Sequence, residues 1–311
     1  MKARFLGVGG IMEGMRKRWT IGMVIAALVA CLALAGCGAG AGADSVDVAP
    51  VGAAFSMPEQ VLLPEVASEG PAIDATHAAD GYVVARMSSA ARLKFQVAGE
   101  SGTYNYDLPN NGEPTVFPIN MGDGAYRFRI MKNTGGNDYA EAESVEADVA
   151  LTSEFAPFLI PNQYCWYGPG STCVAKAHEL ADGAATQAEV VQRVCDFVVE
   201  NVAYDSDKAA VLSAQVGYVP NPDSTLASGT GVCFDYASLG AAMLRSLGIP
   251  AKVVTGNVQP DDLYHAWIMV YIDGTWRSGT LEVRPNEWSR LDLTFAAAGN
   301  VATSYTDRYT Y

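Results

Sequence analysis

Three residues far apart in the chain have the side chains needed for thiol-based nucleophilic catalysis: Cys233, His265 and Asp292. Cys233 follows a glycine-rich turn and precedes a run of apolar residues at three- and four-residue spacing, which predicts a helix. Gly248 and Pro250 mark the end of that helix. Cys233 is therefore expected at a helix N-terminus, where unpaired N–H groups and the helix dipole stabilise a thiolate.

A base for this cysteine must be a histidine, and the chain contains three: His77, His178 and His265. His265 opens the apolar run 265–272, which ends at the hairpin signal Asp273-Gly274 and predicts a buried strand. A strand is a rigid support for a catalytic side chain. His265 is therefore the expected general base.

A third group is needed to hold the imidazole in one tautomer. Asp292 lies in the strand-like stretch 288–295, and a buried carboxylate there requires a partner. We assign Asp292 this role. Asp273 and Glu282 are the alternatives, because they lie nearer to His265 in the sequence.

Several stretches of the chain together resemble the transglutaminase core. They are Gly231-Val232-Cys233 with Tyr236-Ala237, Leu244–Ala251, His265-Ala266-Trp267, and Trp288 with Leu291–Thr294. The resemblance covers about residues 155–300. It implies a papain-like arrangement in which Cys233 is the nucleophile, His265 the general base and Asp292 its partner.

The segment before Cys233 also resembles this family. A capping box, Thr186 to Glu189, predicts a helix with a buried valine stripe that ends near Tyr204. Tyr204 is a candidate oxyanion donor, with simple packing as the alternative; the backbone N–H of Cys233 is a second candidate donor. Residues 206–228 are polar and contain prolines, which predicts a loop over the cleft.

The first 37 residues have the pattern of a bacterial lipoprotein signal. Arg16-Lys17-Arg18 precede an apolar run, and Leu34-Ala35-Gly36 precede Cys37. We expect Cys37 to be lipidated and the protein to be exported, anchored to the cell membrane and facing outside. Cleavage would change the net charge from −14 to −18, which disfavours nucleic acid as a partner.

Two further cysteines, Cys165 and Cys173, flank the turn Gly168-Pro169-Gly170. In an exported protein this spacing is compatible with a disulfide or with two thiols, and both remain open. We find no metal-ligand spacing and no nucleotide motif, so neither a metal nor another cofactor is expected.

The chain is expected to have four parts. Residues 1–36 are the signal peptide, 37–76 a flexible tether, 77–152 a β-sandwich domain with short alternating strands, and 153–311 the catalytic domain. The expected fold class is α+β, a papain-like transglutaminase-core domain preceded by a small antiparallel β-sandwich.

The expected function is thiol-dependent acyl transfer or hydrolysis on protein or peptide amides. The resemblance implies a protein or cell-wall peptide substrate at the outer face of the membrane. The sequence does not choose between water and an amine as the acceptor. The alternative from another class is a non-catalytic surface lipoprotein that keeps this fold for binding.

Overall fold

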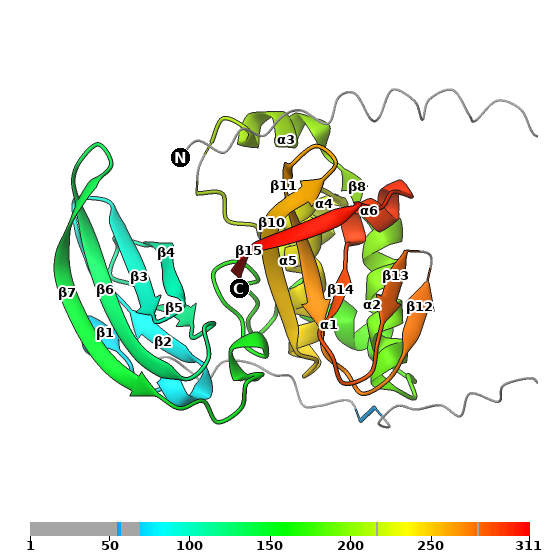
Figure 1. Cartoon of the computed structure of the whole chain (residues 1–311), viewed down its shortest axis with the longest axis horizontal. Helices are drawn as coiled ribbons and strands as arrows, with labels where there is room; N and C mark the ends of the chain where they lie inside the picture. The colour runs from blue at the N-terminus through cyan, green and yellow to red at the C-terminus, as the bar shows by residue number, and fades with distance from the viewer. Residues whose placement is uncertain (1–54, 57–68, 216, 279) are drawn as a thin grey trace, which may run out of the picture.

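The structure is a computed structural model and describes residues 55–56 and 69–311, except 216 and 279. It contains an antiparallel β-sandwich followed by a mixed helix-and-sheet domain (Figure 1). This confirms the expected α+β class with a leading sandwich. The signal segment and Cys37 lie outside the described residues. None of the helices in the described part of the chain is long and apolar enough to cross a membrane.

The sandwich is built from two antiparallel sheets. One has the order β4-β3-β6-β7 and the other β1-β2-β5. Alternate residues of the central strand β3 are buried, and Phe95 on β3 stacks on Phe117 of β5 with 4.4 Å between ring centroids. The strands are β1 Ile73–Asp74, β2 Tyr82–Ala85, β3 Leu93–Gly99, β4 Gly102–Leu108, β5 Thr115–Pro118, β6 Gly124–Gly135 and β7 Asp138–Val149.

The second domain is organised around helix α5, Cys233–Ser246, in which every residue except Phe234 is buried. This helix packs against α1, α2, α4 and α6 and against one face of an antiparallel sheet of order β14-β11-β10-β15. Its wide apolar surface explains this central position. The helices are α1 Thr172–Ala181, α2 Gln187–Asn201, α3 Ser206–Leu212, α4 Pro222–Ser228 and α6 Leu293–Ala298.

The sheet and two small strand pairs complete this domain. The long strands are β10 Ala251–Gln259 and β11 Leu263–Val270, flanked by β14 Ser289–Leu291 and β15 Ser304–Thr310. Strands β12 Trp276–Ser278 and β13 Leu281–Val283 form an antiparallel pair, and β8 Ala203–Tyr204 pairs in parallel with β9 Thr230–Gly231. Two short 3₁₀ helices, Ala78–Asp80 and Ala156–Phe158, lie outside these layers.

Strand β15 also connects the two domains. Its Thr310 N–H donates to the Tyr104 hydroxyl at 3.2 Å, and its carbonyl accepts from Asn120 Nδ2 at 2.6 Å. The ring of Tyr311 then packs on Tyr164 and, edge-on, on Tyr106 of the sandwich. Figure 1 shows β15 running from the helical domain toward the sandwich. The last strand is therefore held by both domains.

Arg245 lies at the C-terminal end of α5 and is completely buried. Its guanidinium donates three hydrogen bonds of 2.7 Å each, to the carbonyl oxygens of Ala251, Ile160 and Tyr311. These bonds join α5 to β10, to the segment that leads out of the sandwich, and to the residue after β15. A planar guanidinium suits this arrangement, because it holds its N–H donors in fixed directions.

Replacing Arg245 should therefore destabilise the protein. Arg245→Met keeps much of the side-chain volume but removes all three hydrogen bonds. The Tyr311 carbonyl still accepts from the Val253 N–H at 2.8 Å, whereas a buried carbonyl left unpaired costs about 1–3 kcal/mol. We expect the free energy of unfolding, measured by urea denaturation, to fall by about 3 kcal/mol or more. Arg284→Met is the matched control: Arg284 is 65% exposed, and its loss should cost less than about 1 kcal/mol. Equal effects of the two substitutions would contradict this account.

Candidate active site

Cys233 is the first residue of α5, as expected. The preceding residue, Val232, caps the helix, and its N–H donates to Asp235 Oδ2 at 2.8 Å. Gly231 is required here, because a Cβ at this position would lie 2.6 Å from Cβ of Asp235. The thiol therefore begins a rigid helix, at the end where the dipole is positive.

His265 lies on β11, where it pairs in register with Gly256 of β10. Its side chain is 3% exposed. The Phe295 ring stacks on the imidazole with 4.5 Å between centroids. Nε2 is 2.9 Å from Asp292 Oδ2 and 3.1 Å from Oδ1. The Cys233 sulfur lies close enough to the imidazole to raise its pKa through charge and hydrogen bonding. Because Asp292 occupies Nε2, Nδ1 is the ring nitrogen left for the sulfur.

Asp292 is fixed by two donors in addition to His265. The Phe295 N–H donates to Oδ1 at 3.0 Å, and the Tyr305 hydroxyl donates to Oδ2 at 2.9 Å. The sequence indicated one strand over 288–295, and this prediction is wrong. Strand β14 ends at Leu291, and Asp292 is the N-cap of α6. An aspartate at that position favours a helix start over a continuing strand.

The structure thus brings Cys233, His265 and Asp292 together in the order expected from the sequence. Of the alternative acids, Glu282 lies on β13 and pairs with Arg284 at 3.2 Å. Asp273 follows the far end of β11, whereas His265 lies near its beginning.

The pKa of His265 reflects this environment. Burial lowers it, but the adjacent Cys233 sulfur and the Asp292 carboxylate raise it more, through charge and hydrogen bonds, to about 10. The imidazolium form of His265 is therefore favoured by its two neighbours, the Asp292 carboxylate and the Cys233 sulfur. A buried ionisable group whose pKa is shifted by specific neighbours is typical of a functional site.

Tyr204 reaches this site through the small parallel sheet. Its backbone pairs with Gly231, two residues before Cys233. Burial and the nearby Cys233 sulfur raise the pKa of the Tyr204 phenol. The hydroxyl is therefore a neutral donor beside the cysteine at physiological pH.

Asp235, three residues after the N-cap of α5, also holds part of the segment 206–228. Its carboxylate is completely buried, accepts from the Tyr218 hydroxyl and pairs with Lys208 Nζ at 2.7 Å. Residues 206–228, predicted as a loop, contain α3 and α4. An acid three residues after an N-cap is the signal that identifies this carboxylate. Nothing in the sequence pairs Asp235 with Lys208 or Tyr218.

The disulfide between Cys165 and Cys173 is not formed. Both are free and buried thiols. The Cys165 thiol lies 3.5 Å from Asn162 Oδ1, and the Cys173 backbone N–H donates to Asp223 Oδ1 at 2.8 Å. Burial raises the pKa of both thiols. Both side chains are packed within the core of the helical domain.

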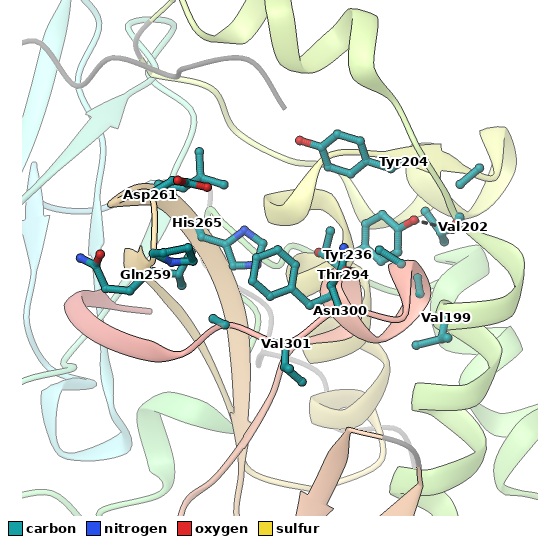
Figure 2. A pocket seen from close by; sticks show the side chains of 18 residues that line it. Val199, Val202, Tyr204, Tyr236, Gln259, Asp261, His265, Thr294, Asn300 and Val301 are labelled. Atoms are coloured by element: carbon teal, nitrogen blue, oxygen red, sulfur yellow. Dashed lines mark hydrogen bonds between the residues drawn. The ribbon is translucent and has the colours of Figure 1, made fainter. Parts of the chain in front are cut away.

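A cavity of about 420 Å³ opens beside His265. It is bounded by the end of α2, by β8, by the β10–β11 turn and by α6 (Figure 2). Tyr204 and His265 both lie on its wall. Among the described residues, no group of three or more His, Cys, Asp or Glu side chains is arranged to hold a metal ion.

Sequence comparison agrees with this architecture. Residues 174–292 match the transglutaminase-like superfamily, and this part of the chain is a transglutaminase-like domain. A UPF0252 protein of Archaeoglobus fulgidus is 26% identical over 97 residues, which are 27% of this chain and 31% of that protein. An uncharacterized protein of Mycobacterium leprae is 30% identical over 95 residues, 24% of this chain and 34% of that protein. The chain therefore spans about a third of either relative.

Solved structures give weaker overlaps. A proposed cysteine protease from Cytophaga hutchinsonii has a TM-score of 0.33 and 16% identity, over 74% of this chain and 86% of that one. A transglutaminase from red sea bream has a TM-score of 0.27 and 12% identity, over 72% of this chain and 49% of that one. The family assignment rests on the sequence match and not on these overlaps.

The environment of His265 is directly testable by NMR. Cys233→Ala and Asp292→Asn each remove an influence that raises the imidazole pKa, so each should lower it by about one unit or more. The double variant should titrate below 6.5, because burial then acts alone. The measurement is the pH titration of the His265 ring resonance, and His77 serves as an internal reference. An unchanged His265 titration in both single variants would contradict this assignment.

Proposed function

We propose that this protein is a thiol-dependent enzyme that transfers or hydrolyses acyl groups of protein or peptide amides. The observation that carries the proposal is the buried His265 ring, which is hydrogen-bonded to Asp292 at 2.9 Å and whose pKa is raised by the nearby Cys233 sulfur. That arrangement supplies a nucleophile, a proton carrier and an orienting acid. The transglutaminase-like domain is consistent with this chemistry.

The first half of the reaction forms a thioester. The Cys233 sulfur attacks the amide carbonyl carbon, and the developing oxyanion is stabilised by the Cys233 N–H and the Tyr204 hydroxyl. The C–N bond then breaks, and the amine leaves with a proton from the His265 imidazolium. Because Asp292 holds Nε2 of His265 in a hydrogen bond, Nδ1 stays directed at the Cys233 sulfur.

The second half releases the acyl group. His265, now neutral, takes a proton from water or from a primary amine, which attacks the thioester carbon. The C–S bond breaks and the thiolate and imidazolium are restored. Water gives a carboxylic acid, and an amine gives a new amide. Both acceptors use the same three side chains.

The proposed place of action is the outer face of the cell membrane, with Cys37 carrying the lipid. This rests on the basic, apolar and small-residue pattern that ends at Cys37. Proteins and cell-wall peptides are the amide-bearing polymers found there, and they are the proposed substrates.

A first test is the reactivity of the thiols. Cys165, Cys173 and Cys195 are completely buried and burial raises the pKa of each, so iodoacetamide at pH 6.5 should label Cys233 well before them. Peptide mapping by mass spectrometry of the full chain gives the rate at each site. His265→Ala should slow labelling of Cys233 by about tenfold or more, while Cys195→Ala should not change it. Equal rates in the His265→Ala variant would support a binding protein instead.

A second test identifies the acceptor. The full chain is incubated with a peptide library and an added primary amine, and mass spectrometry detects cleavage, deamidation or amine incorporation. We expect one of these products from the native protein and a loss of about 10³-fold or more in Cys233→Ala. Tyr204→Phe should give an intermediate loss of about 10²-fold, as for removal of one oxyanion donor. Products that persist in Cys233→Ala would disprove the mechanism.

A further inference from the structure

The cavity beside His265 has an apolar interior that the three catalytic residues do not require. Its walls come from α2, the β10–β11 turn, α6 and the segment that precedes β15. The apolar side chains that line it include Val199, Val202, Val258, Leu263, Phe295 and Ala298. Its mouth carries Val301, which is 67% exposed. Apolar side chains left facing an open cavity are typical of a ligand site.

The place of the cavity connects it to the reacting atoms. His265 and Tyr204 both form part of its wall, and the Cys233 sulfur is near enough to each of them to raise its pKa. A group that fills the cavity therefore lies beside the two side chains that flank the thiol. In Figure 2 the lining side chains extend from His265 and Gln259 across to Val199 and Val202.

The charges of the side chains that line the cavity indicate which chemical class of group it can bind. A pocket for an ammonium or guanidinium group needs a carboxylate at its inner end. Asp261 is the only carboxylate among the lining residues that the structure describes, and it is exposed on the β10–β11 turn. Apart from His265, the other lining side chains are uncharged: most are apolar, and the polar ones are Tyr204, Tyr236, Gln259, Thr294 and Asn300. The interior thus matches an uncharged, apolar group.

We propose that this cavity is the specificity pocket of the enzyme and receives a large apolar side chain, aromatic or branched, of the acyl-donor substrate. The proposal rests on the proposed function for the identity of the reacting thiol. It adds the substrate class: amides whose acyl side carries such a residue close to the reacting carbonyl. Ala298, the last residue of α6, is then a specificity-determining position, because a larger side chain there fills the cavity.

The test compares two alkylating reagents that differ only in an apolar arm. The rate of Cys233 alkylation in the full chain is measured with iodoacetamide and with N-phenyliodoacetamide, and their ratio is divided by the same ratio for glutathione. Burial of a phenyl group predicts a normalised preference of about tenfold or more. In Ala298→Phe the preference should fall below about twofold. Ala140→Phe, the same change on an exposed position of β7, should retain it.

A second measurement does not depend on the thiol. In Cys233→Ala, N-acetylphenylalaninamide should shift the His265 ring resonance in a saturable manner, whereas N-acetylglycinamide should not. Adding Ala298→Phe should remove that shift. Absence of both the phenyl preference and the shift, or their persistence in Ala298→Phe, would overturn the pocket assignment. If Cys233 reacts no faster than glutathione with either reagent, the proposed function fails, and the NMR titration still decides the pocket.

Discussion

The contact between His265 and Asp292 is the interaction on which the site depends. Both side chains are buried, and a buried carboxylate or imidazolium is costly unless each of its polar atoms is paired. Asp292 meets this condition because it caps α6 through the Phe295 N–H and accepts the Tyr305 hydroxyl as well as the imidazole. The same aspartate therefore begins a helix and orients the histidine. A change that moves α6 or β15 is therefore expected to move the His265 ring as well.

The elements that hold these side chains are themselves fixed from several directions. Helix α5 presents Cys233 at one end, and at the other end Arg245 is bonded to three carbonyl groups from separate segments. One of these acceptors, Tyr311, follows the strand that carries Tyr305 and also packs against the sandwich. The sandwich is thus physically connected, through β15, to the hydrogen bonds around Asp292.

The electrostatics of the site follow from exclusion of water. In a medium of low polarity, the attraction of His265 for Cys233 and Asp292 exceeds the penalty of burying its charge, and its pKa rises to about 10. Cys165, Cys173 and Cys195 are more fully buried than Cys233, and burial raises the pKa of each. Burial favours the neutral thiol, whereas a neighbouring imidazolium favours the thiolate.

The amino-acid sequence by itself determined the local features: the helix that starts at Cys233, the strand that carries His265, the alternating strands of the sandwich and the resemblance to the transglutaminase core. These follow from short-range periodicity, capping residues and glycine positions, which act within one or two turns of chain. Only the tertiary structure decided that Asp292 rather than Glu282 contacts His265, and that Tyr305 supports Asp292. It also decided that Lys208 and Tyr218 both bind Asp235. The same holds for Cys165 and Cys173, which remain free thiols. Each of these depends on how strands and helices distant in sequence pack against one another, and a local pattern carries no information about that packing.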